Sequence, residues 1–501
     1  MKNYINKQDM LASVVVFLVA LPLCMGIALA SGVSPARGLV TGIIGGIITG
    51  FLAGAPLQVS GPAAGLTVLV YELVQNHGVE WLGVAVLGAG LLQYLAGKAG
   101  FGRLFQAVSP AVIKGMLAGI GVLIFSSQFH VMVDDKPRSG GLANLLSIPE
   151  AIQKGLVPAD DTAHHLAAVV GLLTLATIVV WEKFKPKKLA LIPAPLIAII
   201  LATGFVAYTG WQISFISVPT ELSEFISLPK LEALQGFDAS IIFSMIALAF
   251  IASAETLLCA TACDALHDGE RADYNQELKA QGIGNMFCGF LGALPMTGVI
   301  VRSSANIKAG GKTRVSAIMH GVWLAAFVLV FPAILSYIPT ASLAGILVYI
   351  GYKLVDIQAI KDLSKYSRWE VAVYAVTVTT IVTVDLLTGV LAGIGLALFR
   401  TIYSLANLDV AVDKQDGDKV DVRLAGAATF ISLPKIAATL EGLERRKNVK
   451  IHLENLLFLD HACLQVLEDF HRLYERQGGK VEIEWNHLDQ LSRDAKLRVA
   501  G

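Results

Sequence analysis

One carboxylate stands in the middle of a long apolar stretch of this chain. Glu255 lies in the motif ASAETLLCATACD at residues 252–264. A carboxylate near the centre of a bilayer costs about 2.5–3.5 kcal/mol on insertion scales, and such residues usually mark functional sites. The i, i+4, i+8 spacing of Glu255, Cys259 and Cys263 places them on one helix face. Glu255 could carry a coupling proton or bind Na⁺ with backbone carbonyls. The alternative is a structural hydrogen bond to nearby backbone.

Two apolar segments are interrupted by proline and glycine. Residues 294–311 read LPMTGVIVRSSANIKAGG, and residues 57–71 read LQVSGPAAGLTVLVY. Such interrupted segments are typical of half-helices that line a cavity in a membrane protein. The unpaired N–H groups and the dipole at the start of a half-helix favour an anion. We therefore expect an anion to bind where the two half-helices start.

The candidate site consists mainly of small residues in these two segments. The alternative is that the glycines only permit tight helix packing and that the cysteines are small packing residues. Arg302 could face the substrate, cap carbonyls or pair with an acid on the inner side, and Asn306 is expected to satisfy broken backbone. The candidate substrate-binding residues are Ser60, Gly61, Ala63, Ala64, Thr297, Gly298 and Val299, with Met25 from the first apolar segment. The candidate coupling-ion residues are Glu255, Thr256, Cys259 and Gly298, with Na⁺ at Glu255 as the metal considered.

The composition is that of a membrane protein. The chain is 55% hydrophobic and 16% charged, with a mean hydropathy of +0.64, whereas a soluble protein carries about 25% charged residues. The five cysteines form no CxxC or Cys/His cluster, which argues against structural metal and disulfides. The sequence contains no Walker loop, nucleophile elbow or HExxH motif, so we expect no enzyme and no ATP-driven pump. We expect no nucleic-acid partner and no cofactor beyond a coupling ion.

The apolar segments form two sets of seven, and the third segment of each set is the interrupted one. This correspondence predicts an inverted repeat of seven plus seven segments, with residues 1–237 as the first repeat and 238–407 as the second. Basic residues concentrate in the inner loops if the N-terminus is cytoplasmic, so we expect a multi-pass protein with both termini in the cytoplasm. The expected segments are 10–29, 35–52, 57–71, 81–96, 109–131, 166–181 and 189–211, then 240–266, 281–291, 294–306, 315–331, 335–352, 370–384 and 386–403. A polar outer loop is expected at residues 134–165.

The pattern changes after residue 407 to short strands alternating with helices. Strands are expected at residues 420–424, 450–454 and 480–485, and helices at 433–446, 462–477 and 487–498. Pro434 suits the first turn of its helix, and Gly478 and Gly479 end the next one. The alternation predicts a small α/β domain with a mostly parallel sheet over residues 408–501. It is expected on the cytoplasmic side.

The chain resembles the sulfate permease (SulP) family of anion transporters over nearly its whole length. The resemblance is carried by ALPLCMGIALASGVSPARGL (20–39), SGPAAGLTVLV (60–70), ASAETLLCATACD (252–264), QGIGNMFCGFLGALPMTGVIVRSSANIKAG (281–310) and a C-terminal STAS-like domain. It implies core and gate domains, a homodimer formed partly through the STAS domain, and an elevator-like movement in the inner (cell) membrane. It also implies an anion between the third and tenth helices.

The resemblance favours bicarbonate as the substrate. Sulfate-type members often carry Gln after the first-helix proline, whereas Leu23 follows Pro22 here. The stretch LDHACLQVLEDF resembles bacterial members associated with carbonic anhydrase, which implies such a partner. We therefore expect secondary-active symport of bicarbonate with Na⁺ or H⁺ through Glu255. A sulfate or C4-dicarboxylate transporter or exchanger is the alternative, because Glu-x-Leu-Leu-Cys resembles dicarboxylate carriers. Two alternatives from other functional classes are an anion channel and a nucleobase carrier of the same architecture.

Overall fold

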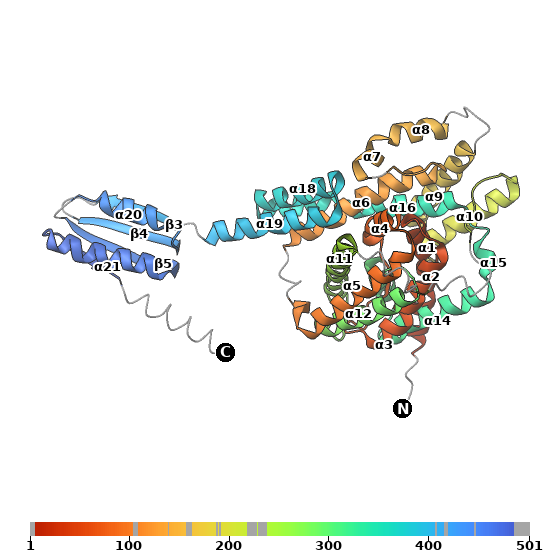
Figure 1. The fold of residues 1–501 in the computed structure, drawn as a ribbon, viewed down its shortest axis with the longest axis horizontal. Coiled ribbons are helices and arrows are strands. Elements are labelled where there is room, and N and C mark those ends of the chain that lie inside the picture. The colour runs from red at the N-terminus through yellow and green to blue at the C-terminus, as the bar shows by residue number, and fades with distance from the viewer. Residues whose placement is uncertain are drawn as a thin grey trace. The chain divides into compact units, whose positions relative to one another are not determined.

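The computed structural model describes residues 6–103, 109–138, 140–156, 163–186, 189, 192–217, 228, 238–405, 408–414, 419–444 and 447–484. They form two compact units, Met1–Ile394 and Gly395–Gly501. The first unit is helical, and the second contains a four-stranded sheet with two helices (Figure 1).

The first half of the helical unit contains long helices and one interrupted segment. Its helices begin at caps that the sequence supplies: the side chains of Asn6, Ser34 and Ser109 accept from backbone N–H groups of α1, α2 and α6. The elements are α1 (Lys7–Ala30), α2 (Pro35–Ile44), the π-helical turn η1 (Gly45–Thr49), α3 (Gly50–Leu52), β1 (Ser60–Pro62), the 3₁₀ turn η2 (Ala64–Leu66), α4 (Thr67–His77), α5 (Glu80–Lys98), α6 (Pro110–Met132), α7 (Gly141–Leu146), α8 (Ile148–Leu156), α9 (His164–Phe184) and α10 (Ala194–Thr209).

The second half also contains long helices and one interrupted segment. Asp238 caps its first helix by accepting from two backbone N–H groups. Asp9, which is buried at the start of α1, accepts from the backbone of Lys312 and Thr313 and so joins the starts of α1 and α14. The elements are α11 (Ala239–Asp264), α12 (Tyr274–Phe290), β2 (Met296–Gly298), α13 (Ile300–Lys308), α14 (Arg314–Val330), α15 (Pro332–Leu335), α16 (Thr340–Leu354), α17 (Ile357–Tyr366), α18 (Arg368–Thr383) and α19 (Leu386–Leu405).

Apolar helices dominate this unit, as predicted for a membrane protein. Eight helices among the described residues are long and apolar enough to cross a membrane, and α10 and α14 are shorter apolar helices. Large apolar side chains such as Leu172, Ile200 and Phe243 are more than 50% exposed on these helices. Such exposure suits a surface that faces lipid.

Two details of the helical unit differ from the sequence expectations. The outer loop expected at residues 134–165 contains the short helices α7 and α8. They form because Ala151 of α8 packs into an apolar cluster with Val133 and Ala168. The segment expected at residues 335–352 becomes helical only at Thr340, where α16 starts, because the separate short helix α15 ends at Leu335.

The C-terminal unit contains a sheet of strand order β3-β4-β5-β6. The pairs β4–β5 and β5–β6 are parallel, and β3–β4 is antiparallel, so the sheet is mostly parallel as predicted. Strand β3 was not among the predicted strands, and the helix expected at residues 487–498 lies outside the described residues. The core is apolar and includes Val422, Ile451, Cys463 and Leu467. The elements are β3 (Leu408–Lys414), β4 (Lys419–Ala428), α20 (Leu433–Glu441), β5 (Asn448–Leu459), α21 (His461–Arg476) and β6 (Lys480–Ile483).

Candidate functional site

The two interrupted segments meet as a short antiparallel pair of strands. Ser60 of β1 pairs with Gly298 of β2, Gly61 with Thr297 and Pro62 with Met296. A further backbone bond joins Val299 N to Val59 O at 2.9 Å. The structure therefore brings together the predicted residues of both segments, and we call this pair of strands the crossing.

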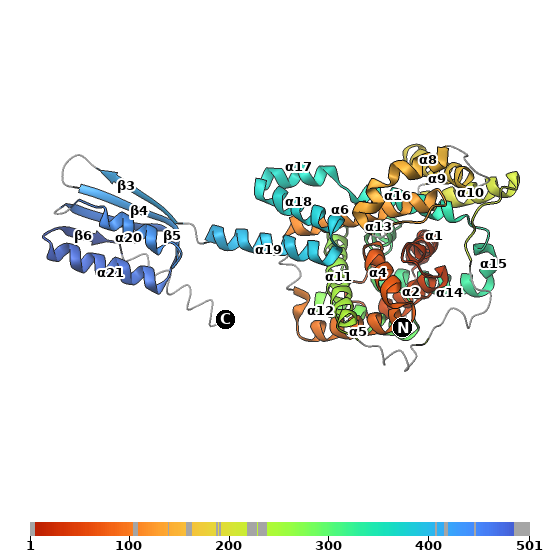
Figure 2. The same ribbon diagram turned by 45° about the horizontal axis from the view of Figure 1, so that its top comes forward.

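Each strand of the crossing is followed at once by a helix. Ala63 is buried between β1 and the turn η2, which begins at Ala64 and leads into α4. Val299 stands directly before α13. The first N–H groups of a helix have no partner inside it, so each helix start offers free donors. Helix α1, which carries the buried Met25, packs beside α4 and α13 (Figure 2).

Glu255 lies between β2 and the turn η2 that follows β1. Thr297 Oγ1 donates to its carboxylate at 3.3 Å. A Cβ atom added at Gly65, in the turn η2, would collide with the same carboxylate. The next residue of α11, Thr256, accepts from Gly298 N at 3.1 Å. Helix α11 thus directs the Glu255 carboxylate and the Thr256 hydroxyl towards β2.

Cys259 lies on the same helix but near different groups. Its Sγ is 3.5 Å from Ser303 Oγ in α13 and 4.0 Å from Cys263 Sγ. Ser303 in turn donates to Val299 O and accepts from Val59 N. Cys259 therefore contacts the residues that hold the segments together, and its thiol packs against α13.

Arg302 is where the structure departs most from expectation. It was expected to face substrate, to cap carbonyls or to pair with an inner acid, yet it is fully buried and has no ion-pair partner among the described residues. None of its three side-chain nitrogens has a hydrogen-bond partner there. Among the described residues, neither a carbonyl nor an acid therefore partners Arg302, and the capping and acid-pairing predictions gain no support there. Asn306, as predicted, satisfies broken backbone by donating to Leu57 O at 3.1 Å.

The guanidinium group of Arg302 lies against β1. A Cβ atom added at Gly61 would overlap its Nη1 and lie 3.0 Å from its Cζ. The missing side chain at Gly61 thus makes the space that Arg302 fills. The Cys24 thiol and the His320 ring are neighbours of the guanidinium, and His320 Nε2 also lacks a partner. A buried cation without a partner is unfavourable, so this arrangement favours an anion beside it.

A cavity of about 740 Å³ runs along α13. One wall comes from α1 and α13, and the other comes from α9, α10 and α16. It touches Ile300 and Val301 at the start of α13 and reaches Lys308 at its end. Lys353 and Glu182, which are 3.6 Å apart, lie at its margin. The cavity therefore connects a helix start of the crossing with a group of charged residues.

A smaller cavity of about 270 Å³ lies along α4. It touches Thr67 and Val68 at the start of that helix and extends to Glu72 and Lys136. Each of the two half-helices therefore lines a cavity of its own. Such a pair of cavities suits a site that is reached from two directions.

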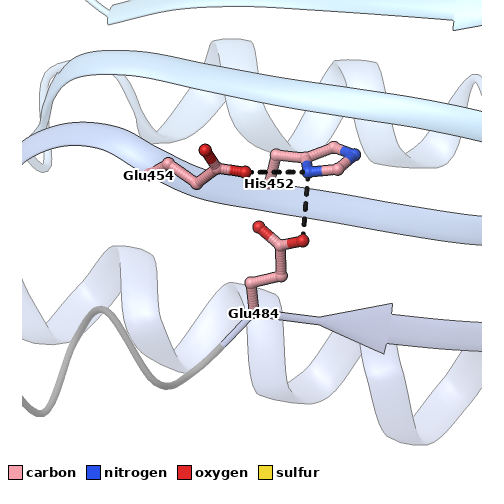
Figure 3. Close-up of side chains that lie close together, drawn as sticks. All are labelled: His452, Glu454 and Glu484. Atoms are coloured by element: carbon pink, nitrogen blue, oxygen red, sulfur yellow. Dashed lines mark ion pairs between the residues drawn. The ribbon is translucent and has the colours of Figure 1, made fainter.

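Among its described residues, the C-terminal unit contains a group of side chains with metal-ligand chemistry, His452, Glu454 and Glu484. His452 Nδ1 is 3.2 Å from Glu484 Oε1 and 3.5 Å from Glu454 Oε1 (Figure 3). Lys450 Nζ is 2.9 Å from the same Glu484 oxygen, and this ion pair holds the pKa of Glu484 below its usual value. Because a lysine already neutralises this oxygen, we assign the group as an ion-pair network of the sheet surface.

Known proteins similar to this chain are membrane transporters. A sequence model described as "Sulfate permease family" matches residues 7–377. YvdB of Bacillus subtilis (strain 168), a candidate sulfate transporter, is 29% identical and is aligned over 95% of this chain and 91% of its own. The bicarbonate transporter BicA of Picosynechococcus is 26% identical, with 80% of this chain and 71% of its own covered. The structure of murine Slc26a9, an anion transporter in the inward-facing state, matches the fold with a TM-score of 0.78 at 17% identity, over 98% of this chain and 88% of that one.

Proposed function

Because the chain belongs to the sulfate permease family, we propose that it moves bicarbonate across a membrane in symport with Na⁺ or H⁺. It is a transmembrane anion transporter and not an enzyme. The choice of anion, the coupling ion and the movement are our proposals. The observation that carries them is the crossing, where two helix starts lie together with Arg302, which is buried and has no hydrogen-bond partner among the described residues.

The crossing supplies the donors that a small oxyanion needs. The starts of α13 and of η2 and α4 offer backbone N–H groups and the positive ends of helix dipoles. The guanidinium of Arg302 adds a planar fork of N–H donors, which matches two oxygens of a planar carboxylate-like anion. Bicarbonate is such an anion, and it would satisfy the nitrogens that have no partner within the described chain.

Glu255 explains why a cation would accompany the anion. Two like charges repel by about 4 kcal/mol at 4 Å and an effective dielectric constant of 20. Since Glu255 contacts Thr297 of the crossing and Gly65 of the turn η2 that follows β1, its negative charge opposes an anion bound there. A proton or a Na⁺ on the carboxylate removes this opposition. Binding of cation and anion would thereby favour each other, which is the basis of symport.

The charge balance of the crossing favours a monovalent anion. Arg302 brings one positive charge and Glu255 one negative charge to it. One monovalent cation and one bicarbonate would leave these four charges balanced. Sulfate or a C4-dicarboxylate would leave one additional negative charge in a buried site, which is unfavourable. These divalent anions remain the alternative, and YvdB is named for sulfate.

The proposed transporter has the architecture expected from the sequence. We propose fourteen spanning segments in two inverted repeats (1–237 and 238–407), which divide into core and gate domains, and a cytoplasmic STAS domain (408–501). Both termini would be cytoplasmic, and the protein would work as a homodimer in the inner membrane by an elevator movement. The repeated order of a strand followed by a half-helix, in β1–α4 and β2–α13, supports this proposal. Association with a carbonic anhydrase would supply bicarbonate.

Uptake by proteoliposomes tests the function directly. The purified chain is reconstituted, and labelled bicarbonate, sulfate and succinate are offered under an imposed Na⁺ or pH gradient. We expect bicarbonate to accumulate above its equilibrium level when one of the gradients points inward. Accumulation of sulfate or succinate alone would assign the alternative substrate. A flux that only equilibrates the anion, whatever the gradient, would indicate a channel and overturn symport.

A further inference from the structure

The crossing is too small to hold itself in place. Each of its strands has three residues, and the two strands pair only with each other. A two-stranded pair is marginally stable alone, even when it is longer than this. Its position must therefore come from contacts with neighbouring helices, and α12 provides most of the polar ones.

Three buried polar residues form a stripe along α12. Glu277, Gln281 and Asn285 follow one another at intervals of four and therefore share one helix face. All three are at most 1% exposed. Helix α12 packs closely on α5 (Figure 1), because Gly282 and Gly90 let the two backbones approach. The stripe thus stands on a firmly held helix pair.

Glu277 holds the segment that leads into β1. Its Oε2 accepts from Gly54 N at 2.8 Å and from Ala55 N at 2.9 Å. Its Oε1 accepts from Gln58 Nε2 at 2.7 Å and from Gln281 Nε2 at 2.9 Å. Four N–H donors therefore satisfy this carboxylate. Three of them come from the two ends of the segment before the strand, and the fourth comes from α12 itself.

Glu277 also dictates how the two glutamines are turned. A carboxylate only accepts hydrogen bonds, so Gln58 and Gln281 must direct their NH₂ groups towards it. With this orientation Gln281 Nε2 also donates to Ser60 Oγ in β1, at 2.5 Å. The amide oxygens of both glutamines are buried without a partner among the described residues. The bonds to Glu277 therefore outweigh the loss of two acceptors.

Asn285 hydrogen-bonds to β2, just as Gln281 hydrogen-bonds to β1. Its Oδ1 accepts from Met296 N at 2.8 Å, and its Nδ2 donates to Met296 O at 3.0 Å. One side chain thereby binds both backbone groups of a strand residue, as a neighbouring strand would. Its Nδ2 also donates to Gln93 Oε1 of α5 at 2.7 Å, which fixes the amide orientation.

We propose that Glu277, Gln281 and Asn285 are positioning residues for anion binding, and this inference rests on the transport function proposed above. The stripe holds β1 and β2 in the register that sets Arg302 against Gly61 and brings the two helix starts together. None of the three residues is proposed to touch the anion. Substitutions that remove hydrogen bonds of the stripe should therefore weaken anion affinity more than they slow turnover.

The substitution Glu277→Gln tests the stripe with little change in shape. The new amide oxygen can still accept from Gly54 N and Ala55 N, but its NH₂ group faces the NH₂ groups of Gln58 and Gln281. Both glutamines must then turn, and Ser60 loses its bond from Gln281. The exchange variant Glu277→Gln with Gln58→Glu puts a carboxylate at position 58, opposite the new NH₂ group, and so removes one of the two clashes. Thr377→Val is the matched control, because among the described residues the buried Thr377 hydroxyl bonds only to Val373 O of its own helix.

The measurement is the KM and the maximal rate of uptake into proteoliposomes, for whichever of bicarbonate, sulfate and succinate the wild type carries. We expect Glu277→Gln to raise KM at least tenfold, with the maximal rate within threefold of wild type. The exchange variant should recover at least a third of the lost affinity, and Thr377→Val should match wild type. An unchanged KM in Glu277→Gln would overturn the proposal. An equal rise of KM in Glu277→Gln and in the exchange variant, together with equally lowered melting temperatures, would make the role only structural and would also overturn it.

A second variant covers the case in which Glu277→Gln does not fold. Asn285→Asp keeps the acceptor for Met296 N but turns a negative oxygen towards Met296 O, so KM should again rise several-fold. An unchanged KM in this variant would overturn the proposal. A wild type that carries sulfate refutes the proposed substrate alone, since the KM comparison is then made with sulfate.

Discussion

The contact between Gly61 and Arg302 makes the most direct prediction about the anion site. In Gly61→Ala, the new methyl group would occupy the position of Arg302 Nη1. The group that must move is the end of a long side chain rather than backbone, so the fold should survive. The guanidinium, however, can no longer lie against β1. We expect Gly61→Ala to bind its anion more weakly while it remains folded and assembled in the membrane.

The size of the effect follows from what the guanidinium offers. A hydrogen bond to a charged group contributes about 1.5–3 kcal/mol. Since about 1.4 kcal/mol corresponds to a factor of ten, loss of one such bond predicts a roughly 10- to 150-fold higher KM. Gly204→Ala is the matched control, because a Cβ atom at Gly204 meets nothing within 4 Å. That variant should transport like wild type.

A double-mutant cycle makes this reasoning refutable. Arg302→Met should weaken anion binding by a similar factor. Adding Gly61→Ala to it should change KM little, because the guanidinium that the methyl group would displace is already gone. KM is measured by uptake in proteoliposomes for the four proteins. Additive effects of the two substitutions would show that Gly61 acts independently of Arg302. A KM in Gly61→Ala equal to that of wild type would refute Arg302 as a ligand.

The remaining predictions concern the coupling acid and the C-terminal sheet. Glu255→Gln, whose neutral amide mimics the protonated acid, should let the anion equilibrate across the vesicle membrane but abolish gradient-driven accumulation; accumulation equal to wild type would contradict coupling. For Glu484, Lys450 lowers the folded pKa below the ordinary value of 4.5. This pair should therefore stabilise β5 and β6 fully above pH 4.5 and lose its contribution as the pH falls through the lower folded pKa. Hydrogen exchange of the β6 amides in the full chain should show this loss in wild type and not in Glu484→Gln, and identical pH profiles would count against the ion pair.

The sequence was most informative where backbone chemistry leaves a mark. Proline and glycine at residues 60–62 and 295–298 predicted two interrupted segments, and both contain a short strand followed by a helix. Their pairing could not be predicted in register, because strands of three residues carry no pattern that selects a partner. Because an acid within an apolar segment is energetically unfavourable, Glu255 could be predicted as a site residue, and it contacts Thr297 of the crossing.

The missed features depend on contacts between segments far apart in sequence. Arg302 was expected to find an acid or carbonyl nearby, but only the paired strands show that Gly61 makes room for it. The polar stripe of Glu277, Gln281 and Asn285 had a signal, since three amide or carboxyl side chains recur every fourth residue at the start of an apolar segment. That signal alone does not say which backbone the stripe binds. Cys259 was placed with Glu255 by helix periodicity, while its thiol meets Ser303.

The pairing of β1 with β2 also bears on how the protein is made. Strand β1 pairs with β2, which lies more than 200 residues later in the sequence, so the first interrupted segment enters the bilayer long before the second is synthesised. Until then its backbone groups lack partners, and unpaired groups are costly in hydrocarbon. The early segment must therefore wait near water, at the insertion machinery or against other chain segments. A nascent chain that stalls between the two segments would expose this unpaired strand to cellular quality control.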